Sequence, residues 1–227
     1  MNAVVLASGG LDSTVAAAIA KQEGLALYLL TVGYGQRHQV EISCARKIAA
    51  WVGAKEHKVL RLDLSVFGGS ALVGEGTVPK HRSDKDREHG IPNTYVPARN
   101  TIFLSLALAY AEVSQAKSIY IGANVLDYSG YPDCRPEFLQ AFQQVARLGT
   151  KIGVEGGTVE IKAPLLQLSK AQIIQRGVEL GVPFELTHSC YDPDEDGVAC
   201  GQCDSCRIRL EGFRQAGLKD PTSYLVV

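Results

Sequence analysis

Short apolar segments alternate with longer helical segments along most of this chain. The short segments are rich in aliphatic and β-branched residues and occupy residues 3–7, 26–32, 57–62, 118–123 and 158–163. Helical periodicity covers residues 12–22, 39–52, 98–114, 136–148 and 169–180, and the helix at 98–114 is apolar on nearly all sides. Largely apolar strands separated by helices are typical of a parallel sheet covered on both faces. The sequence therefore predicts a doubly wound α/β fold, in which the helix at 98–114 is deeply packed.

Length and charge exclude several kinds of protein. The chain has 227 residues, with 23 Lys+Arg against 24 Asp+Glu. This length allows one large domain with a small appendage, and we expect a domain at 1–183 followed by an extension at 184–227. The balanced charge argues against non-specific binding to nucleic acid or acidic membranes. Because no basic leader or membrane-length apolar segment is visible, we expect a cytoplasmic protein without membrane partners.

The first expected strand runs directly into the string Ser8-Gly9-Gly10-Leu11-Asp12-Ser13, where a helix begins. Adjacent glycines let backbone N–H groups turn inward, and a helix N-terminus adds aligned donors and partial positive charge. Ser8 and Ser13 supply hydroxyl donors, and Asp12 can cap the helix or face a magnesium ion. We predict that this loop, extended to Thr14, binds nucleotide phosphates. A capped strand–turn–helix junction is the structural alternative.

This string resembles the PP-loop of the N-type ATP pyrophosphatases, whose signature is SGGxDS. In that family the loop holds the β- and γ-phosphates of ATP while the substrate attacks the α-phosphate. The resemblance implies AMP and pyrophosphate as products, magnesium on the phosphates, and Asp12 and Ser13 as residues essential for turnover. Lys162 and Lys170 stand where family members place phosphate-binding cations, and a solvated lysine is the alternative for each. Arg37, after the second strand, is a further phosphate candidate, with a surface turn as its alternative.

Two further strings place aromatic, carboxylate and guanidinium groups near a strand end and a helix start. The first is TYVPARN at 94–100, and the second is GANVLDYSGYPDCRPEF at 122–138. A planar polar heterocycle needs rings to stack on, carboxylates for its N–H groups and arginine for an anionic substituent. The candidate substrate-binding residues are Tyr95, Arg99, Asn100, Asp127, Asp133 and Arg135. For any single residue, a loop with helix caps is the alternative.

Together these strings resemble the 7-cyano-7-deazaguanine synthase family (QueC), over residues 4–206. The resemblance implies a fold of the adenine-nucleotide α-hydrolase type and a carbon–nitrogen ligase. Such an enzyme converts 7-carboxy-7-deazaguanine, ammonia and ATP into the nitrile precursor of queuosine, through adenylated intermediates. Its partners would be small molecules, and a homodimer stays open. The alternatives are a PP-loop tRNA-modifying enzyme of the thiolase or lysidine type and a non-catalytic nucleotide-binding regulator.

Four cysteines gather near the end of the chain, and a helix is expected at 204–215. They follow the pattern Cys190-x9-Cys200-x2-Cys203-x2-Cys206. Four soft thiolates suit tetrahedral zinc, and an all-cysteine site is structural. An iron–sulfur cluster is the rival, because C-x2-C-x2-C also opens ferredoxin motifs. No Cys-Pro follows Cys206, and the resembled family carries zinc, so we predict one structural zinc per chain.

Residues 67–97 form a long insertion that contains glycines and, in its middle, charges of both signs. Loops of this length in compact domains are often functional or disordered. Two interpretations stay open for it, a solvated loop and a lid over the active site.

Overall fold

The computed structural model describes residues 1–36, 38–74, 76–82, 90–126 and 130–225. Five parallel strands form one sheet in the order β3-β2-β1-β4-β5. They are β1 (Asn2–Leu6), β2 (Ala26–Gly33), β3 (Glu56–Arg61), β4 (Ala116–Tyr120) and β5 (Glu160–Lys162). The chain moves outward from β1 to β3 and then crosses to the other side of β1, so the strand order reverses between β1 and β4. Doubly wound sheets bind ligands at this reversal point.

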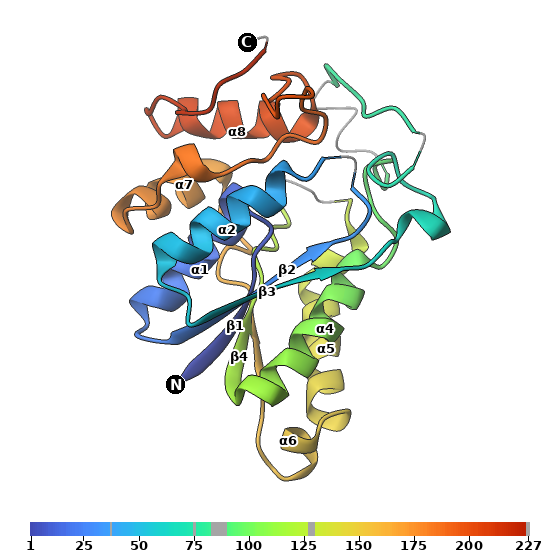
Figure 1. Ribbon diagram of the computed structural model, residues 1–227, viewed down its shortest axis with the longest axis vertical. Helices are drawn as coiled ribbons and strands as arrows, with labels where there is room; N and C mark the ends of the chain where they lie inside the picture. Colours follow the sequence, from blue (N-terminus) through green and yellow to red (C-terminus); the bar gives the residue numbers. More distant parts are fainter. Residues whose placement is uncertain (37, 75, 83–89, 127–129, 226–227) are drawn as a thin grey trace.

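Helices cover both faces of the sheet, which confirms the predicted doubly wound fold. They are α1 (Leu11–Gln22), α2 (Val40–Val52), α4 (Arg99–Ser114), α5 (Pro136–Leu148), α6 (Lys151–Val154), α7 (Lys170–Glu179) and α8 (Asp204–Gln215). Figure 1 shows α1 and α2 on one face and α4 and α5 on the other, with α7 and α8 in a further layer outside α1. Among the described residues, no helix combines the length and the apolar character that crossing a membrane requires.

The fourth strand ends three residues earlier than its apolar pattern predicts. β4 stops at Tyr120, and residues 121–124 leave the sheet. A Cβ atom on Gly122 would lie 2.8 Å from the backbone nitrogen of Ser13, so the chain here passes directly against the start of α1. The apolar residues that extended the expected strand to 123 therefore form a wall beside the phosphate loop.

Helix α4 is deeply packed on one side, as predicted from its apolar character, but its opposite side is exposed. Leu104, Ala107 and Ala111 are buried, whereas Val113 is 80% exposed. The cause is the position of the helix, because α4 contacts β1, β2 and β4 with one face and turns the opposite face to solvent. Exposed apolar residues on single helix faces are common in folded proteins.

The largest hydrophobic cluster joins segments that are far apart in the sequence. It contains strand and α4 residues together with Leu72 and Val78 from the insertion at 67–97 and all four clustered cysteines. The described part of the insertion is therefore partly packed into the core, unlike a fully solvated loop. The hydrophobic core runs without a break across position 183, and the two-part division of the chain stays a prediction.

Candidate active site

A cavity of about 210 Å³ opens at the carboxyl edge of the sheet, where β1 and β4 diverge. Its walls come from the ends of β1 and β2, the loop after β4, the first turn of α4 and the loop that carries Cys190. From the expected phosphate loop, Ser8 and residues 10–13 line it. The cavity therefore lies at the reversal point of the sheet, with the phosphate loop as one wall.

Hydrogen bonds within the phosphate loop hold its hydroxyl groups in place. The Ser8 and Ser13 hydroxyl oxygens lie 3.0 Å apart, and the Ser8 backbone N–H donates to Ser13 Oγ at 3.2 Å. Thr14 Oγ1 donates to the Gly10 carbonyl at 2.8 Å and does not line the cavity. These hydrogen bonds hold the loop in shape without a ligand. Thr14 contributes to that shape through its bond to Gly10 and does not contact the cavity.

Gly9 allows helix α2 to approach the phosphate loop closely. Its φ angle is +82°, and a Cβ atom there would lie 2.3 Å from the Glu41 carbonyl oxygen and 2.7 Å from the Ala45 nitrogen. The Gly9 carbonyl accepts a hydrogen bond of 2.9 Å from the His188 backbone N–H. Gly9 itself does not line the cavity. It joins the loop to α2 on one side and to the cysteine-bearing loop on the other.

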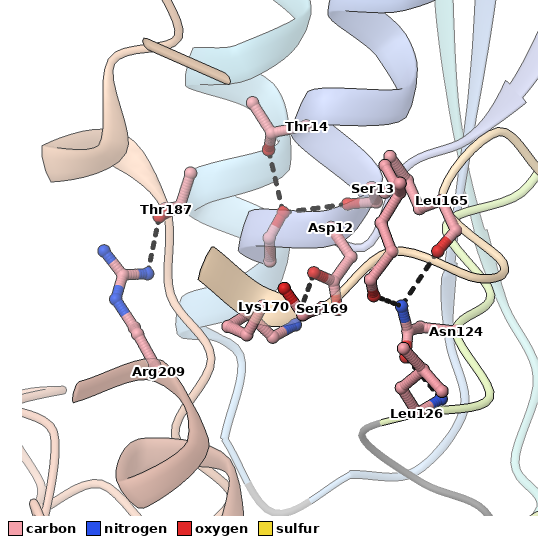
Figure 2. A network of polar contacts seen from close by, with 12 residues as sticks. Asp12, Ser13, Thr14, Asn124, Leu126, Leu165, Ser169, Lys170, Thr187 and Arg209 are labelled. Carbon is pink, nitrogen blue, oxygen red and sulfur yellow. Dashed lines mark hydrogen bonds and ion pairs between the residues drawn. The ribbon is translucent and has the colours of Figure 1, made fainter. Parts of the chain in front are cut away.

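Lys170 reaches the phosphate loop from helix α7, as Figure 2 shows. Its Nζ lies 2.6 Å from Asp12 Oδ1, and the two side chains are only 10% and 24% exposed. A capping box at Ser169 fixes the start of α7. A Cβ atom on Gly212 of α8 would lie 2.3 Å from Lys170 Cγ, so the stem of Lys170 passes through a space that glycine leaves. The fold therefore places this cation beside Asp12.

Lys162 does not line the cavity, and its expected role as a phosphate ligand stays a prediction. Its Nζ pairs with Glu23 Oε2 at 3.0 Å and lies 5.3 Å from the centre of the Tyr120 ring. Glu23 follows the C-terminal end of α1, at the edge of the sheet opposite the phosphate loop. The Lys162 ammonium therefore lies beside Glu23 and Tyr120, and not beside the phosphate loop.

Two of the expected substrate residues, Arg99 and Asn100, line the cavity. The Arg99 guanidinium lies 5.5 Å from the centre of the Tyr34 ring, and its Nη1 is 3.5 Å from the Tyr34 hydroxyl. Such stacking fixes a planar cation without consuming all of its donors. Both residues belong to the first turn of α4, whose N-terminus points into the cavity.

Three other expected substrate residues do not line the cavity, and two of them, Asp133 and Tyr95, hold the entry into α4. Asp133 is buried, and its Oδ2 accepts from the Asn100 backbone N–H at 2.9 Å, as a cap does. The Tyr95 hydroxyl accepts from the Ala98 backbone N–H at 2.9 Å. Arg135 is exposed and donates to the Pro132 carbonyl. None of the three lines the cavity, and their expected contact with substrate stays a prediction.

Arg37 and Asp127, also expected at the site, lie outside the described residues. Asn124, from the same expected substrate string as Asp127, does line the cavity. Its Nδ2 donates to the carbonyls of Leu165 and Leu168 at 2.8 and 2.6 Å, as Figure 2 partly shows. These bonds attach the loop after β4 to the segment that leads into α7.

The cavity wall also contains a carboxyl group that no sequence motif indicated. Glu41 lies in the first turn of α2 and faces Gln36 and Arg99. Burial raises the pKa of Glu41 to about 7, while the Arg99 charge and a hydrogen bond from Gln36 act in the opposite direction. Only the position of Glu41 in the sequence could have indicated its place in the cavity, because α2 begins at the same edge of the sheet as α1. A shifted carboxyl in a cavity is a candidate for proton transfer.

The loop that carries Cys190 forms a further wall that the sequence did not indicate. His188, Ser189 and Tyr191 line the cavity, and His188 is buried. Burial first, and then the charge of Arg209, lower the pKa of His188 to about 4, so its imidazole is neutral. Among the described residues, no group bonds to its Nε2. A buried polar atom without a partner in a cavity wall is typical of a ligand contact.

The four clustered cysteines are all buried, and their Sγ atoms lie within 4.8 Å of one another. The Cys190–Cys203 and Cys200–Cys206 sulfur pairs are each 4.0 Å apart. Four thiolates around a zinc ion, with bonds of about 2.3 Å, lie about 3.8 Å apart. Backbone N–H groups also point at the sulfurs, including those of Asp192 and Cys200 on Cys190 Sγ at 3.3 and 3.2 Å. The cluster therefore fits a metal ion with four sulfur ligands.

Fold and phosphate loop together define an enzyme of the PP-loop class. Two solved structures share the fold at low identity. NMN synthetase from Francisella tularensis has a TM-score of 0.50 at 18% identity, covering 96% of this chain and 78% of its own. A 4-thiouridine synthetase, in an RNA complex with bound ATP, has a TM-score of 0.51 at 19% identity, covering 95% and 50%. These likenesses show the fold alone.

The chain belongs to the family of the queuosine biosynthesis protein QueC, whose model matches residues 2–217. The 7-cyano-7-deazaguanine synthase of Desulfatibacillum aliphaticivorans is 59% identical over 224 residues, which are 98% of this chain and 96% of that protein. The resemblance carried by the sequence motifs is thereby confirmed.

Proposed function

We propose that this protein is a carbon–nitrogen ligase that converts 7-carboxy-7-deazaguanine and ammonia into 7-cyano-7-deazaguanine, at the expense of ATP. The observation that carries the proposal is the similarity to a 7-cyano-7-deazaguanine synthase across nearly the whole of both chains. The intact SGGLDS loop in the wall of a cavity supports it. The same similarity favours this reaction over a tRNA-modifying enzyme or a non-catalytic regulator.

In this proposal the phosphate loop binds the β- and γ-phosphates of ATP. The hydroxyls of Ser8 and Ser13 and the N–H groups at the start of α1 donate to the phosphate oxygens. Asp12 faces magnesium, and Lys170 adds positive charge at 2.6 Å from Asp12. With the leaving pyrophosphate held in this way, the α-phosphate is exposed to attack from the opposite side.

The nitrile requires two activations of oxygen at one site. A carboxylate oxygen first attacks the α-phosphate, and ammonia then displaces AMP to give a primary amide. The amide oxygen attacks a second ATP, and AMP leaves as the nitrile forms. Both rounds need the same in-line geometry, so one phosphate loop serves both once AMP and pyrophosphate have left.

Arg99 and Asn100 are the proposed contacts of the deazaguanine substrate. Arg99 offers a cation held against Tyr34 in the cavity wall, which suits a planar carboxylate. Asn100 stands beside it at the N-terminus of α4. Tyr34 offers an aromatic face in the same wall.

Zinc is the proposed metal of the cysteine cluster, with Cys190, Cys200, Cys203 and Cys206 as its ligands. An all-thiolate set with no open position makes the ion structural. When bound, it would tie residues 184–227 to the insertion, because Lys80 bridges to Cys203 and its Nζ pairs with Asp192 at 2.9 Å. It would also fix the loop that carries His188 against the cavity. The balanced charge of the chain supports free small molecules, rather than nucleic acid, as partners.

A comparison of two starting materials tests the proposed reaction. The acid with ammonium should give the nitrile with two AMP and two pyrophosphate released, and the synthetic primary amide should give it without ammonium and with one of each. Mass spectrometry identifies the products. Release of ADP and phosphate would contradict the phosphate-loop assignment, and failure of the amide to become nitrile would contradict the two-round scheme.

A further inference from the structure

A second, much smaller cavity adjoins the main one. Its volume is about 20 Å³, and its lining includes Tyr34, Gln36, His38, Glu41 and Tyr191. All of these except His38 also line the main cavity. The small cavity is therefore a side chamber of the main cavity, on the side of helix α2.

The volume of the side chamber indicates which molecule could occupy it. A volume of about 10–15 Å³ measured in this way holds one water molecule. A space of about 20 Å³ therefore holds one molecule of that size, whereas the heterocycle and the nucleotide are far larger. Among the substrates of the proposed reaction, ammonia alone is this small.

The polar lining of the side chamber suits a donor molecule. Gln36 Oε1 accepts from the Tyr34 backbone N–H at 2.7 Å, which directs the amide group of Gln36 toward Glu41. Glu41, Tyr34 and Tyr191, whose side chains carry oxygen atoms that can accept hydrogen bonds, also line the side chamber. Ammonia offers three N–H bonds and one lone pair, so acceptor oxygens around it leave the lone pair to point into the main cavity.

We propose that the side chamber is the ammonia subsite, and that Glu41 accepts the proton that ammonia loses when it attacks the activated substrate. This inference rests on the proposed function, because only that reaction supplies the acyl-adenylate. It assigns Glu41 a catalytic role in the step that follows the first adenylation.

The atoms and electrons of this step balance with ammonia, the acyl-adenylate and Glu41 alone. The ammonia lone pair forms the C–N bond at the acyl carbon, and the nitrogen becomes cationic. One N–H proton then passes to a Glu41 oxygen, and the C–O bond to AMP breaks with its electron pair leaving on AMP. The products are the primary amide, AMP and a protonated Glu41, which later releases its proton to water.

The electrostatic surroundings of Glu41 agree with this role. Burial raises the pKa of Glu41 to about 7, against the effects of Arg99 and Gln36. A carboxyl in this range is substantially ionised near neutral pH and is a stronger proton acceptor than an ordinary glutamate. Arg99 from α4 keeps the charged form accessible.

The Glu41→Gln variant separates proton transfer from adenylation. Three rates are measured. They are the exchange of pyrophosphate into ATP in the presence of 7-carboxy-7-deazaguanine, amide formation from ammonium, and hydroxamate formation from hydroxylamine. Hydroxylamine is the weaker base, so its adduct loses a proton to water readily. We expect exchange and hydroxamate formation within about threefold of wild type, and amide formation reduced by about 100-fold or more. The matched control is Glu160→Gln, an exposed carboxyl on β5, which should leave all three rates unchanged.

A second variant tests the chamber rather than the carboxyl. Val40→Leu adds one methylene at its lining and should raise the KM for ammonium while pyrophosphate exchange stays at the wild-type rate. Equal losses of amide and hydroxamate in Glu41→Gln, or unchanged amide formation, would overturn the inference. So would an unchanged KM for ammonium in Val40→Leu. Absence of acid-dependent exchange in the wild-type protein would instead overturn the proposed function.

Discussion

Replacing Gly9 with alanine tests how closely helix α2 approaches the phosphate loop. Two costs add in this variant. The φ angle of +82° lies in the left-handed region, which costs a residue with a Cβ about 1–2 kcal/mol. The new Cβ would also lie 2.3 Å from the Glu41 carbonyl oxygen, and this backbone atom cannot rotate away as a flexible side chain could.

The overlap gives the expected size of the second cost. An ordinary contact would need the Cβ at about 3.4 Å or more, so α2 or the loop must shift by about 1 Å. Forcing extra atoms into a packed region typically costs about 1–3 kcal/mol. The sum predicts that Gly9→Ala lowers the free energy of unfolding by about 2–5 kcal/mol. Because the loop moves, ATP turnover should fall as well.

Gly24 provides the matched control. Its φ angle is +74°, and no atom lies within 4 Å of an added Cβ. Gly24→Ala should therefore cost only the first contribution, about 1–2 kcal/mol, and leave ATP turnover unchanged. Urea unfolding of the two variants, followed by circular dichroism, measures the difference. Equal destabilisation would refute the argument that α2 backbone contact makes Gly9 necessary.

Three further predictions concern charged side chains and the cysteines. Lys170→Met should lower kcat/KM for ATP by about tenfold or more in steady-state assays, because a charge-assisted contact is lost. Lys162→Met removes only a pair with Glu23 and should leave kcat/KM for ATP within about twofold of wild type. Asp220→Asn should destabilise the fold by about 3–5 kcal/mol at pH 7, because Asp220 and its partner Arg209 are both almost fully buried. Burial alone would raise the pKa of Asp220, but Arg209 and the Tyr224 hydroxyl lower it. The stabilisation by the ionised Asp220 is therefore present above about pH 4 and is lost as the pH falls through the folded-state pKa. Below that pKa, wild type and variant should have similar free energies of unfolding in urea. Chelation should lower the thermal unfolding midpoint, with one zinc released per chain by elemental analysis, and bound iron with labile sulfide would contradict the assignment.

The phosphate loop could be predicted from the sequence because its structure is local. A strand, two glycines and a helix start are consecutive, so residues 8–13 need no distant segment to be recognised. Lys170 could be placed for a related reason, since it opens a helix at the carboxyl edge. The position of such residues is set by the helix or strand to which they belong.

Residues whose roles depend on side-chain direction could not be assigned in the same way. Lys162 ends a strand as expected, but its ammonium lies beside Glu23. Asp133 lies in the expected substrate string, yet its carboxylate caps α4. Glu41 and His188 enter the cavity from α2 and from the cysteine-bearing loop, and only the packing of those segments shows it.

The order in which the chain is synthesised has a consequence for when the active site exists. The phosphate loop is made first, but His188, Tyr191 and Ser205 complete its cavity, and Gly212 leaves the space for Lys170. A nascent chain that still lacks these residues carries the full nucleotide signature without the cavity that would use it.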